Sequence, residues 1–330
     1  MLERQGIIDL EISRTFKYRI SHILEVQLNN QIKILYDVLD GYNISQNNME
    51  NSLEMVDFYF KRSYDIDHHK YFKMSEKIFP LGFNYSVTTQ NDIFDKKDTG
   101  PFSLVTGFFC NKLLKQHREF NVEIFEDIPQ KTNKLQILFT TRLWDPSEVK
   151  LGTSKISSNE RKYEREYIND MRVDCINKLR KEFAGRFIGG VAPSNFAEKY
   201  FPEYVVRGST LKRKNFIKLV KDSNICIATM GLLKSNGWKI GEYIAASKAI
   251  VSEKLHYSVP GNFQINKNYL EFNSSNECLE QTMKLAENTD YIYSMMVNNY
   301  LYYHNFLRPD RLVLNSLLLS LRKCKKSTPF

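Results

Sequence analysis

The stretch from Gly237 to Glu242 reads GWKIGE and brings glycines, a lysine and a carboxylate close together. Glycine lets a backbone approach a ligand closely, and the free N–H groups and positive dipole end of a helix start attract anions. A carboxylate in the first turn of that helix can accept hydrogen bonds from ribose hydroxyls. The pattern therefore indicates a nucleotide phosphate site, although a plain capping carboxylate has the same pattern.

Short apolar runs on both sides must position this stretch. Residues 225–229 (ICIAT) and 249–251 (AIV) are typical of buried strands, and the polar segment 230–238 is typical of a loop. We expect the helix to open near Lys239, so that Glu242 lies in its first turn.

The same rhythm of strand and helix extends over the second part of the chain. We predict strands at 135–141, 186–191, 225–229, 249–252 and 269–272, and helices at 157–183, 195–201, 211–222, 275–286, 288–303 and 309–323. This alternation predicts a parallel, doubly wound α/β sheet whose ligands bind beyond the carboxyl ends of the strands. Arg142, Gly190 and Gly237 are expected at that edge.

The first part of the chain is less regular. We predict strands at 6–12, 31–37, 54–64, 77–85 and 121–126, and an amphipathic helix at 102–119. The breaker-rich segment PQKTNK at 129–134 is a candidate linker. A chain of 330 residues is too long for one typical core, so we expect two domains, 1–130 and 131–330.

Several polar residues follow the predicted strands of the first part. Asp40 is either a turn residue, which we favour, or a general base that faces a cleft. A solvated strand end explains Lys61 and Arg62 at least as well as an anion site. His68 and His69 have no further ligands nearby in sequence, so a surface loop is favoured over a metal site.

Composition limits the classes of protein that remain. With 42% hydrophobic residues the chain can bury globular cores, and its net charge of +9 favours anionic partners such as nucleotide phosphates, lipid headgroups or nucleic acid. Five scattered cysteines without a CxxC pair argue against a disulfide framework or structural zinc and for a reducing compartment.

Localisation follows from apolar runs and charge. No run approaches the length of a membrane span, and residues 1–10 carry charges where a signal peptide needs an apolar core. We therefore expect a cytoplasmic protein. Near the C-terminus, the apolar run LVLNSLLLSL precedes basic residues; it either packs on the domain, which we favour, or lies at the inner face of the membrane.

From Leu135 onward the sequence resembles the nucleotide-sugar-binding half of GT-B glycosyltransferases, in particular the group 1 enzymes of bacterial polysaccharide biosynthesis. Four features carry the resemblance: a strand that ends in Arg142, the strand and glycine turn RFIGGV, the helix and strand NFIKLVKDSNICIAT, and the loop, helix and strand GWKIGEYIAASKAIVSE. From Leu135 to the C-terminus it covers roughly the last 60% of the chain.

The resemblance implies two Rossmann-like domains that face a cleft, the N-terminal one short or atypical, with helices at the C-terminus. The implied activity is transfer of a sugar from a nucleotide diphosphate sugar to a hydroxyl of a glycan, glycolipid or protein acceptor, in bacterial surface polysaccharide or glycolipid synthesis. No metal or other cofactor is expected. The implied donor-binding residues are Arg142, Gly190, Lys234, Gly237, Trp238, Lys239, Gly241 and Glu242, and the candidate catalytic residues are Asp40 and His68.

The chain also departs from the family pattern. Many retaining members have two glutamates eight positions apart, whereas here Glu242 matches the second and Lys234 stands at the first. A lysine at that position can face the phosphates of the donor instead. The basic partner usually found after the arginine would be Lys150.

Two other classes of function remain as alternatives. A catalytically silent GT-B-like partner subunit would bind a nucleotide without turnover. A basic nucleic-acid-binding protein is disfavoured, because no binding motif is visible and the basic residues are interspersed with acids. We therefore expect a nucleotide sugar and no nucleic acid as partner.

Overall fold

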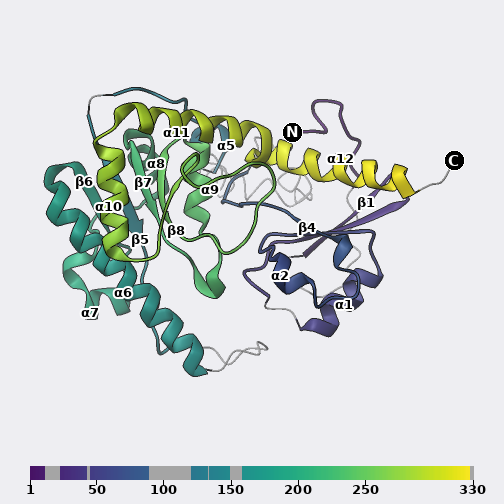
Figure 1. The fold of residues 1–330 in the computed structure, drawn as a ribbon, viewed down its shortest axis with the longest axis horizontal. Helices are drawn as coiled ribbons and strands as arrows, with labels where there is room; N and C mark the ends of the chain where they lie inside the picture. Colours follow the sequence, from purple (N-terminus) through teal and green to yellow (C-terminus); the bar gives the residue numbers. More distant parts are fainter. Residues whose placement is uncertain (12–22, 43–44, 89–119, 133, 149–157, 328–330) are drawn as a thin grey trace, which may run out of the picture.

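The computed structural model describes residues 1–11, 23–42, 45–88, 120–132, 134–148 and 158–327. Two sheets lie side by side, and successive C-terminal helices run along the top of the view from one to the other (Figure 1). The predicted helix at 102–119 and Lys150 lie outside the described residues.

The first sheet has the strand order β1-β2-β3-β4. Its strands are β1 (Ile23–Leu28), β2 (Ile32–Asp37), β3 (Phe58–Lys61) and β4 (Ile78–Pro80), with the helices α1 (Gln46–Glu54) and α2 (Ile66–His69) between them. β1 pairs antiparallel with β2, while β2, β3 and β4 are parallel. The parallel strands direct their carboxyl ends toward one edge.

The second sheet is entirely parallel, in the order β6-β5-β7-β8-β9. Its strands are β5 (Ile137–Thr141), β6 (Phe187–Val191), β7 (Ile225–Ala228), β8 (Ala249–Glu253) and β9 (Leu270–Phe272). Successive side chains point to opposite faces, so Ile225 and Ile227 join one core and Cys226 and Ala228 the other. This confirms the predicted doubly wound α/β sheet.

Helices cover both faces of the second sheet. One core contains residues of α6 (Ser158–Phe183), α7 (Asn195–Tyr200), α10 (Ser275–Ala286) and α11 (Thr289–Tyr302). The opposite core contains residues of α5 (Val122–Phe125), α8 (Arg213–Asp222) and α9 (Trp238–Ala245). Except for α5, these helices agree with the sequence prediction within a few residues.

Three predicted elements of the first part were wrong. Residues 6–11 form no strand, and the antiparallel strand at 23–28 was missed. Residues 121–126 form the short helix α5, because Asn121 caps it by accepting a hydrogen bond from Glu123 N at 3.3 Å. His68 and His69 belong to the short helix α2 and not to a loop.

The C-terminal helix α12 (Pro309–Ser327) packs on the first sheet, whereas the helix before it covers the second. Leu317 is buried against Ile34 and Phe60, and Tyr36 Oη lies 2.6 Å from Ser316 Oγ. Among the described residues, none of the helices has the length and apolar character needed to cross a membrane.

Residues before the predicted boundary at 130 also pack on the second sheet. Phe83, Tyr85 and Phe125 are buried in a core of the second sheet. Residues 1–130 and 131–330 therefore share cores, and the boundary between two domains stays a prediction.

We expect Leu317→Ala to lower the free energy of unfolding by about 2–4 kcal/mol, because it leaves a cavity between α12 and the first sheet. Urea denaturation followed by circular dichroism measures this. Leu318→Ala is the matched control, since Leu318 is 38% exposed; it should cost less than about 1 kcal/mol. Equal losses in both variants would contradict this role of α12.

Candidate functional site

The second sheet has a topological switch point between β5 and β7. The chain passes from β5 outward to β6 and then returns to the other side of β5 to form β7. Open α/β sheets bind ligands in the crevice at the carboxyl ends of such strands. Here the loop after β5 begins with Arg142, and residues 229–237 connect β7 to α9.

One face of α6 holds the loop after β5. Asn169 accepts a hydrogen bond from Trp144 N at 2.9 Å and donates one to Trp144 O at 2.7 Å. Arg172, three positions further along the helix, donates to Arg142 O at 2.6 Å. Residues three apart on a helix share a face, so α6 fixes the direction in which Arg142 leaves the strand.

Arg172 also holds the loop after β7. Its guanidinium donates to Thr229 Oγ1 at 3.0 Å and to Met230 O at 2.8 Å. Glu253, at the end of β8, accepts from Met230 N at 3.0 Å. Burial lowers the pKa of Arg172 to about 10, and the Glu253 carboxylate opposes this shift. The two loops that flank the switch point are thus joined through one buried side chain.

The far end of the β7–α9 loop is held by the same helix. Glu164 of α6 accepts a hydrogen bond from Leu233 N at 2.6 Å. Leu233 and Lys234 both have positive φ angles, 58° and 55°, which orient this turn. The Lys234 side chain is exposed.

Arg142 presents a cation at the switch point. Its guanidinium lies 3.9 Å from the ring centroid of Trp144, an arrangement that fixes the plane of the group and leaves its N–H donors at the edge. Burial lowers the pKa of Arg142, and the Asp40 carboxylate raises it. No ion pair of Arg142 is found in the described part of the chain.

Lys239 presents a second cation, from the first turn of α9. Its Nζ lies 3.4 Å from Thr140 Oγ1 in β5 and 3.9 Å from the ring centroid of Phe216. Burial lowers its pKa, which the charge of Glu242 partly opposes. Over the described ranges Lys239 also has no ion pair, so its charge is only weakly compensated.

Glu242 is buried, with 6% of its surface exposed, and accepts a hydrogen bond from Arg213 NH1 at 2.8 Å. Arg213 is itself held by Ser86 O. The prediction that Glu242 lies in the first helical turn was wrong: α9 begins at Trp238, so Glu242 is its fifth residue. The ribose-binding role of Glu242 stays a prediction.

Three glycines of the predicted site lie where a Cβ would come too close to a backbone oxygen. A Cβ at Gly237 would lie 3.0 Å from Thr229 O, and one at Gly241 would lie 3.1 Å from a backbone oxygen of the segment after β4. At Gly190 a Cβ would lie 2.4 Å from Tyr204 O. Gly190 and Gly241 thus serve close packing within the protein, whereas Gly237 allows the loop after β7 to close.

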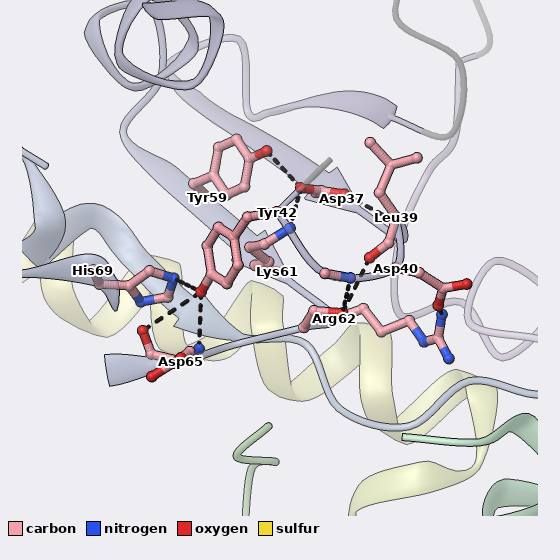
Figure 2. Close-up of polar contacts among 11 residues, drawn as sticks. Asp37, Leu39, Asp40, Tyr42, Tyr59, Lys61, Arg62, Asp65 and His69 are labelled. Atoms are coloured by element: carbon pink, nitrogen blue, oxygen red, sulfur yellow. Dashed lines mark hydrogen bonds and ion pairs between the residues drawn. The ribbon is translucent and has the colours of Figure 1, made fainter. Parts of the chain in front are cut away.

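Residues of the first sheet reach the same region. Arg62, directly after β3, forms an ion pair with Asp40 (Figure 2). It also donates to Asn236 O at 2.8 Å. The ring centroid of the half-exposed Trp238 lies 5.9 Å from its guanidinium carbon. The solvated strand end considered for Lys61 and Arg62 was therefore wrong, because these side chains are only 1% and 5% exposed.

Behind this pair lies a second, buried ion pair. Lys61 Nζ lies 2.8 Å from Asp37 Oδ2, which also accepts from Tyr59 Oη at 2.7 Å (Figure 2). Asp37 Oδ1 accepts from Leu39 N at 2.8 Å and so fixes the turn that carries Asp40.

The structure does not bring His68 together with the switch-point cations through any described contact. Its exposed ring lies against that of Tyr42, with 3.9 Å between centroids and the two planes tilted by 37°. His69 is buried instead, and its Nε2 lies 2.5 Å from Tyr42 Oη, as Figure 2 shows. Burial lowers the pKa of His69 to about 4, so this ring is neutral near pH 7.

Metal ligands are not gathered in the described ranges, where no group of three or more His, Cys, Asp or Glu side chains could hold an ion. The absence of a cofactor stays a prediction.

Sequence reasoning missed Arg172, Arg213 and Arg62 as parts of this region. A signal for Arg172 was present: it shares its helix face with the buried residues Ile168, Cys175 and Leu179. An arginine on an apolar stripe needs polar partners, which indicates a structural clamp. Arg213 and Arg62 depend on partners distant in sequence, which no local pattern identifies.

No protein-family model and no curated protein matches the chain. Solved structures do match. A group 1 glycosyl transferase from Francisella tularensis (LpcC, C-terminal domain) is 10% identical, with a TM-score of 0.37, over 56% of this chain and 95% of that domain. A glycosyltransferase from Rickettsia africae is 13% identical, with a TM-score of 0.48, over 88% and 71% of the two chains.

TarM of S. aureus is 12% identical, with a TM-score of 0.45. The match covers 86% of this chain, which spans only half the length of TarM. With TM-scores below 0.5, these similarities assign neither residues nor an activity.

We expect Lys239→Met to raise the melting temperature by about 2–4 °C, corresponding to ~1 kcal/mol, because it removes a desolvated charge that lacks a carboxylate partner. The lowered pKa means that the charge penalises the folded state at neutral pH. The gain should therefore shrink as pH rises from the folded-state pKa through 10.5, because well above 10.5 the lysine is neutral in both states.

Melting curves recorded across pH test this. Lys218→Met, an exposed position on α8, is the control and should leave the melting temperature nearly unchanged. A destabilised Lys239→Met variant would contradict the prediction.

Proposed function

We propose that this protein is a glycosyltransferase that moves a sugar from a nucleoside diphosphate sugar to an acceptor hydroxyl. The observation that carries the proposal is the pair of cations at the switch point, Arg142 and Lys239, for which the described residues provide no ion pair. Cations without an ion pair at this position fit a diphosphate, which carries several negative charges in a small volume.

The cations would stabilise the leaving group. In the reaction, the acceptor oxygen forms a bond to the anomeric carbon while the bond from that carbon to the diphosphate oxygen breaks. The diphosphate departs with the electron pair, so its negative charge grows in the transition state. Arg142 and Lys239, together with the free N–H groups at the start of α9, are placed to stabilise that charge.

Glu242 is the proposed ribose ligand. Arg213 occupies one of its oxygens, which holds the carboxylate in place and leaves Oε2 as an acceptor for a ribose hydroxyl. Trp238 is half-exposed at the start of α9, where its ring can flank the base or sugar. Lys234 is the proposed outer contact to the phosphates.

The acceptor side is assigned to the first sheet. In an inverting course, the acceptor proton goes to a carboxylate, and Asp40 is the candidate because its side chain is 47% exposed. His68 is the second candidate. We further propose that the transfer needs no metal ion and uses a hexose. Its product would belong to bacterial surface polysaccharide or glycolipid synthesis, with the protein in the cytoplasm or peripheral to the membrane.

A thermal-shift screen against UDP, GDP, ADP and their sugars tests the function. One nucleoside diphosphate should raise the melting temperature, and its sugar should be hydrolysed or transferred. Binding without turnover would instead fit a silent partner subunit. No shift with any ligand would contradict the proposal, and affinity for nucleic acid that falls steeply with salt would favour the remaining alternative.

We expect Glu242→Gln to weaken binding of the identified nucleoside diphosphate about tenfold, because an amide replaces the charged acceptor of the ribose hydroxyl. Inorganic pyrophosphate should bind both variants equally, since it has no ribose. Isothermal titration calorimetry measures both affinities. The exposed Glu280→Gln on α10 is the control. Equal affinity of the wild type and Glu242→Gln for the nucleotide would exclude the ribose role.

Arg142→Ala should weaken binding of pyrophosphate, which Glu242→Gln leaves unchanged. It removes a phosphate contact, so affinity for both the nucleoside diphosphate and pyrophosphate should fall about 10- to 100-fold. The free nucleoside should bind as before. Loss of nucleoside binding together with phosphate binding would indicate a damaged loop instead of a lost contact.

A further inference from the structure

Asp40 and Arg62 come from adjacent parallel strands of the first sheet and meet beyond their carboxyl ends. Asp40 follows β2, Arg62 follows β3, and their side chains form an ion pair (Figure 2). The two members differ in exposure: the side chain of Arg62 is 4% exposed and that of Asp40 is 47% exposed. The carboxylate is therefore the member that can leave the pair easily.

Arg62 is anchored independently of Asp40. Its NH2 group donates to Asn236 O, in the loop between β7 and α9, at 2.8 Å. Its backbone N–H donates to Asp37 O at 2.9 Å. If Asp40 moved away, the guanidinium would still face the switch-point loop, with NH1 free to bind another anion.

The charge of Asp40 acts on a second arginine. Its carboxylate raises the pKa of Arg142, while burial lowers it. The effect places Asp40 within electrostatic range of Arg142 as well as in contact with Arg62. One carboxylate thus forms an ion pair with Arg62 of the first sheet and acts on the charge of Arg142 of the second, where the proposed function would place a diphosphate.

We propose that Asp40 is an exchangeable internal anion: it holds Arg62 while the site is empty, and a nucleoside diphosphate displaces it and takes over the Arg62 guanidinium. This inference rests on the proposed function and adds Arg62 of the first sheet as a diphosphate ligand. Exchange of a half-exposed carboxylate for a more highly charged diphosphate keeps the buried guanidinium compensated throughout.

The exchange links donor binding to the acceptor side. The Asp40 carboxylate is occupied by Arg62 before the donor binds and becomes available to an acceptor hydroxyl afterwards. Donor binding thereby prepares the base without any movement of the sheets.

A double-mutant cycle tests the exchange. Affinities for UDP and GDP are measured by calorimetry at constant ionic strength for the wild type, Asp40→Asn, Arg62→Gln and the double variant. Asp40→Asn should bind the preferred nucleotide about 5- to 10-fold more tightly, because the competing anion is gone. In the Arg62→Gln background the same change should gain less than about twofold to threefold.

Asp67→Asn makes the same charge change at a side chain that is 88% exposed and should leave the affinity unchanged. If Arg62→Gln proves unstable, Arg62→Lys replaces it. This variant keeps the charge but not the planar fork, so its affinity for the nucleotide should lie between those of the wild type and Arg62→Gln. Equal gains from Asp40→Asn with and without Arg62 would overturn the exchange, because they indicate general charge repulsion. So would weaker binding by Asp40→Asn.

The two proposals fail in different ways. If neither the wild type nor Asp40→Asn binds a nucleoside diphosphate, the proposed function fails and the exchange with it. If the wild type binds and Asp40→Asn gains no affinity, only the exchange is wrong.

Discussion

The buried guanidinium of Arg172 is the interaction on which the candidate site depends. It donates to Arg142 O, Thr229 Oγ1 and Met230 O, and so joins the loops that leave β5 and β7. These loops leave the paired strands β5 and β7 at the switch point, where open α/β sheets bind ligands. A planar group with donors in fixed directions suits this task, because it fixes several acceptors relative to one another. The positions of Arg142 and of the start of α9 both follow from it.

Four cations of the site fall into two kinds: those that hold loops and helices together, and those that can bind an anion. Arg213 forms an ion pair with Glu242, and the three hydrogen bonds of Arg172 all go to protein oxygens, so these two side chains hold the protein together. Arg142 and Lys239 are held by aromatic rings and a hydroxyl. Rings orient a cation without neutralising it, which preserves attraction for an anion. This division separates the groups that shape the crevice from those that can bind within it.

The sequence predicted the second sheet well and the first sheet poorly, for a physical reason. In the second sheet, long helices alternate with apolar strands, and both periodicities are local. In the first sheet, the hairpin between β1 and β2 depends on Asn29 and Asn30, whose φ angles are 52° and 56°. Asparagine pairs favour such a turn, but the strand before it has no buried residue and lacks a clear apolar pattern. The cation positions at 142 and 239 could be predicted from strand and helix ends. The partners of Arg62 and Glu242 could not, because they lie on other elements.

The chain passes between the two sheets at neighbouring points. Leu81 packs with the first sheet and Phe83 with the second, while Leu307 packs with the second and Leu312 with the first. A Cβ at Gly82 would lie 3.8 Å from Leu312 Cδ1, so these crossings are in contact. These two neighbouring connections form a short hinge between the sheets. A hinge of this kind permits rotation of one sheet relative to the other but resists translation. Such a rotation would lengthen the contact from Arg62 to Asn236 O and leave the crossings intact. The carboxyl ends of the two sheets would then move apart and together about a fixed axis.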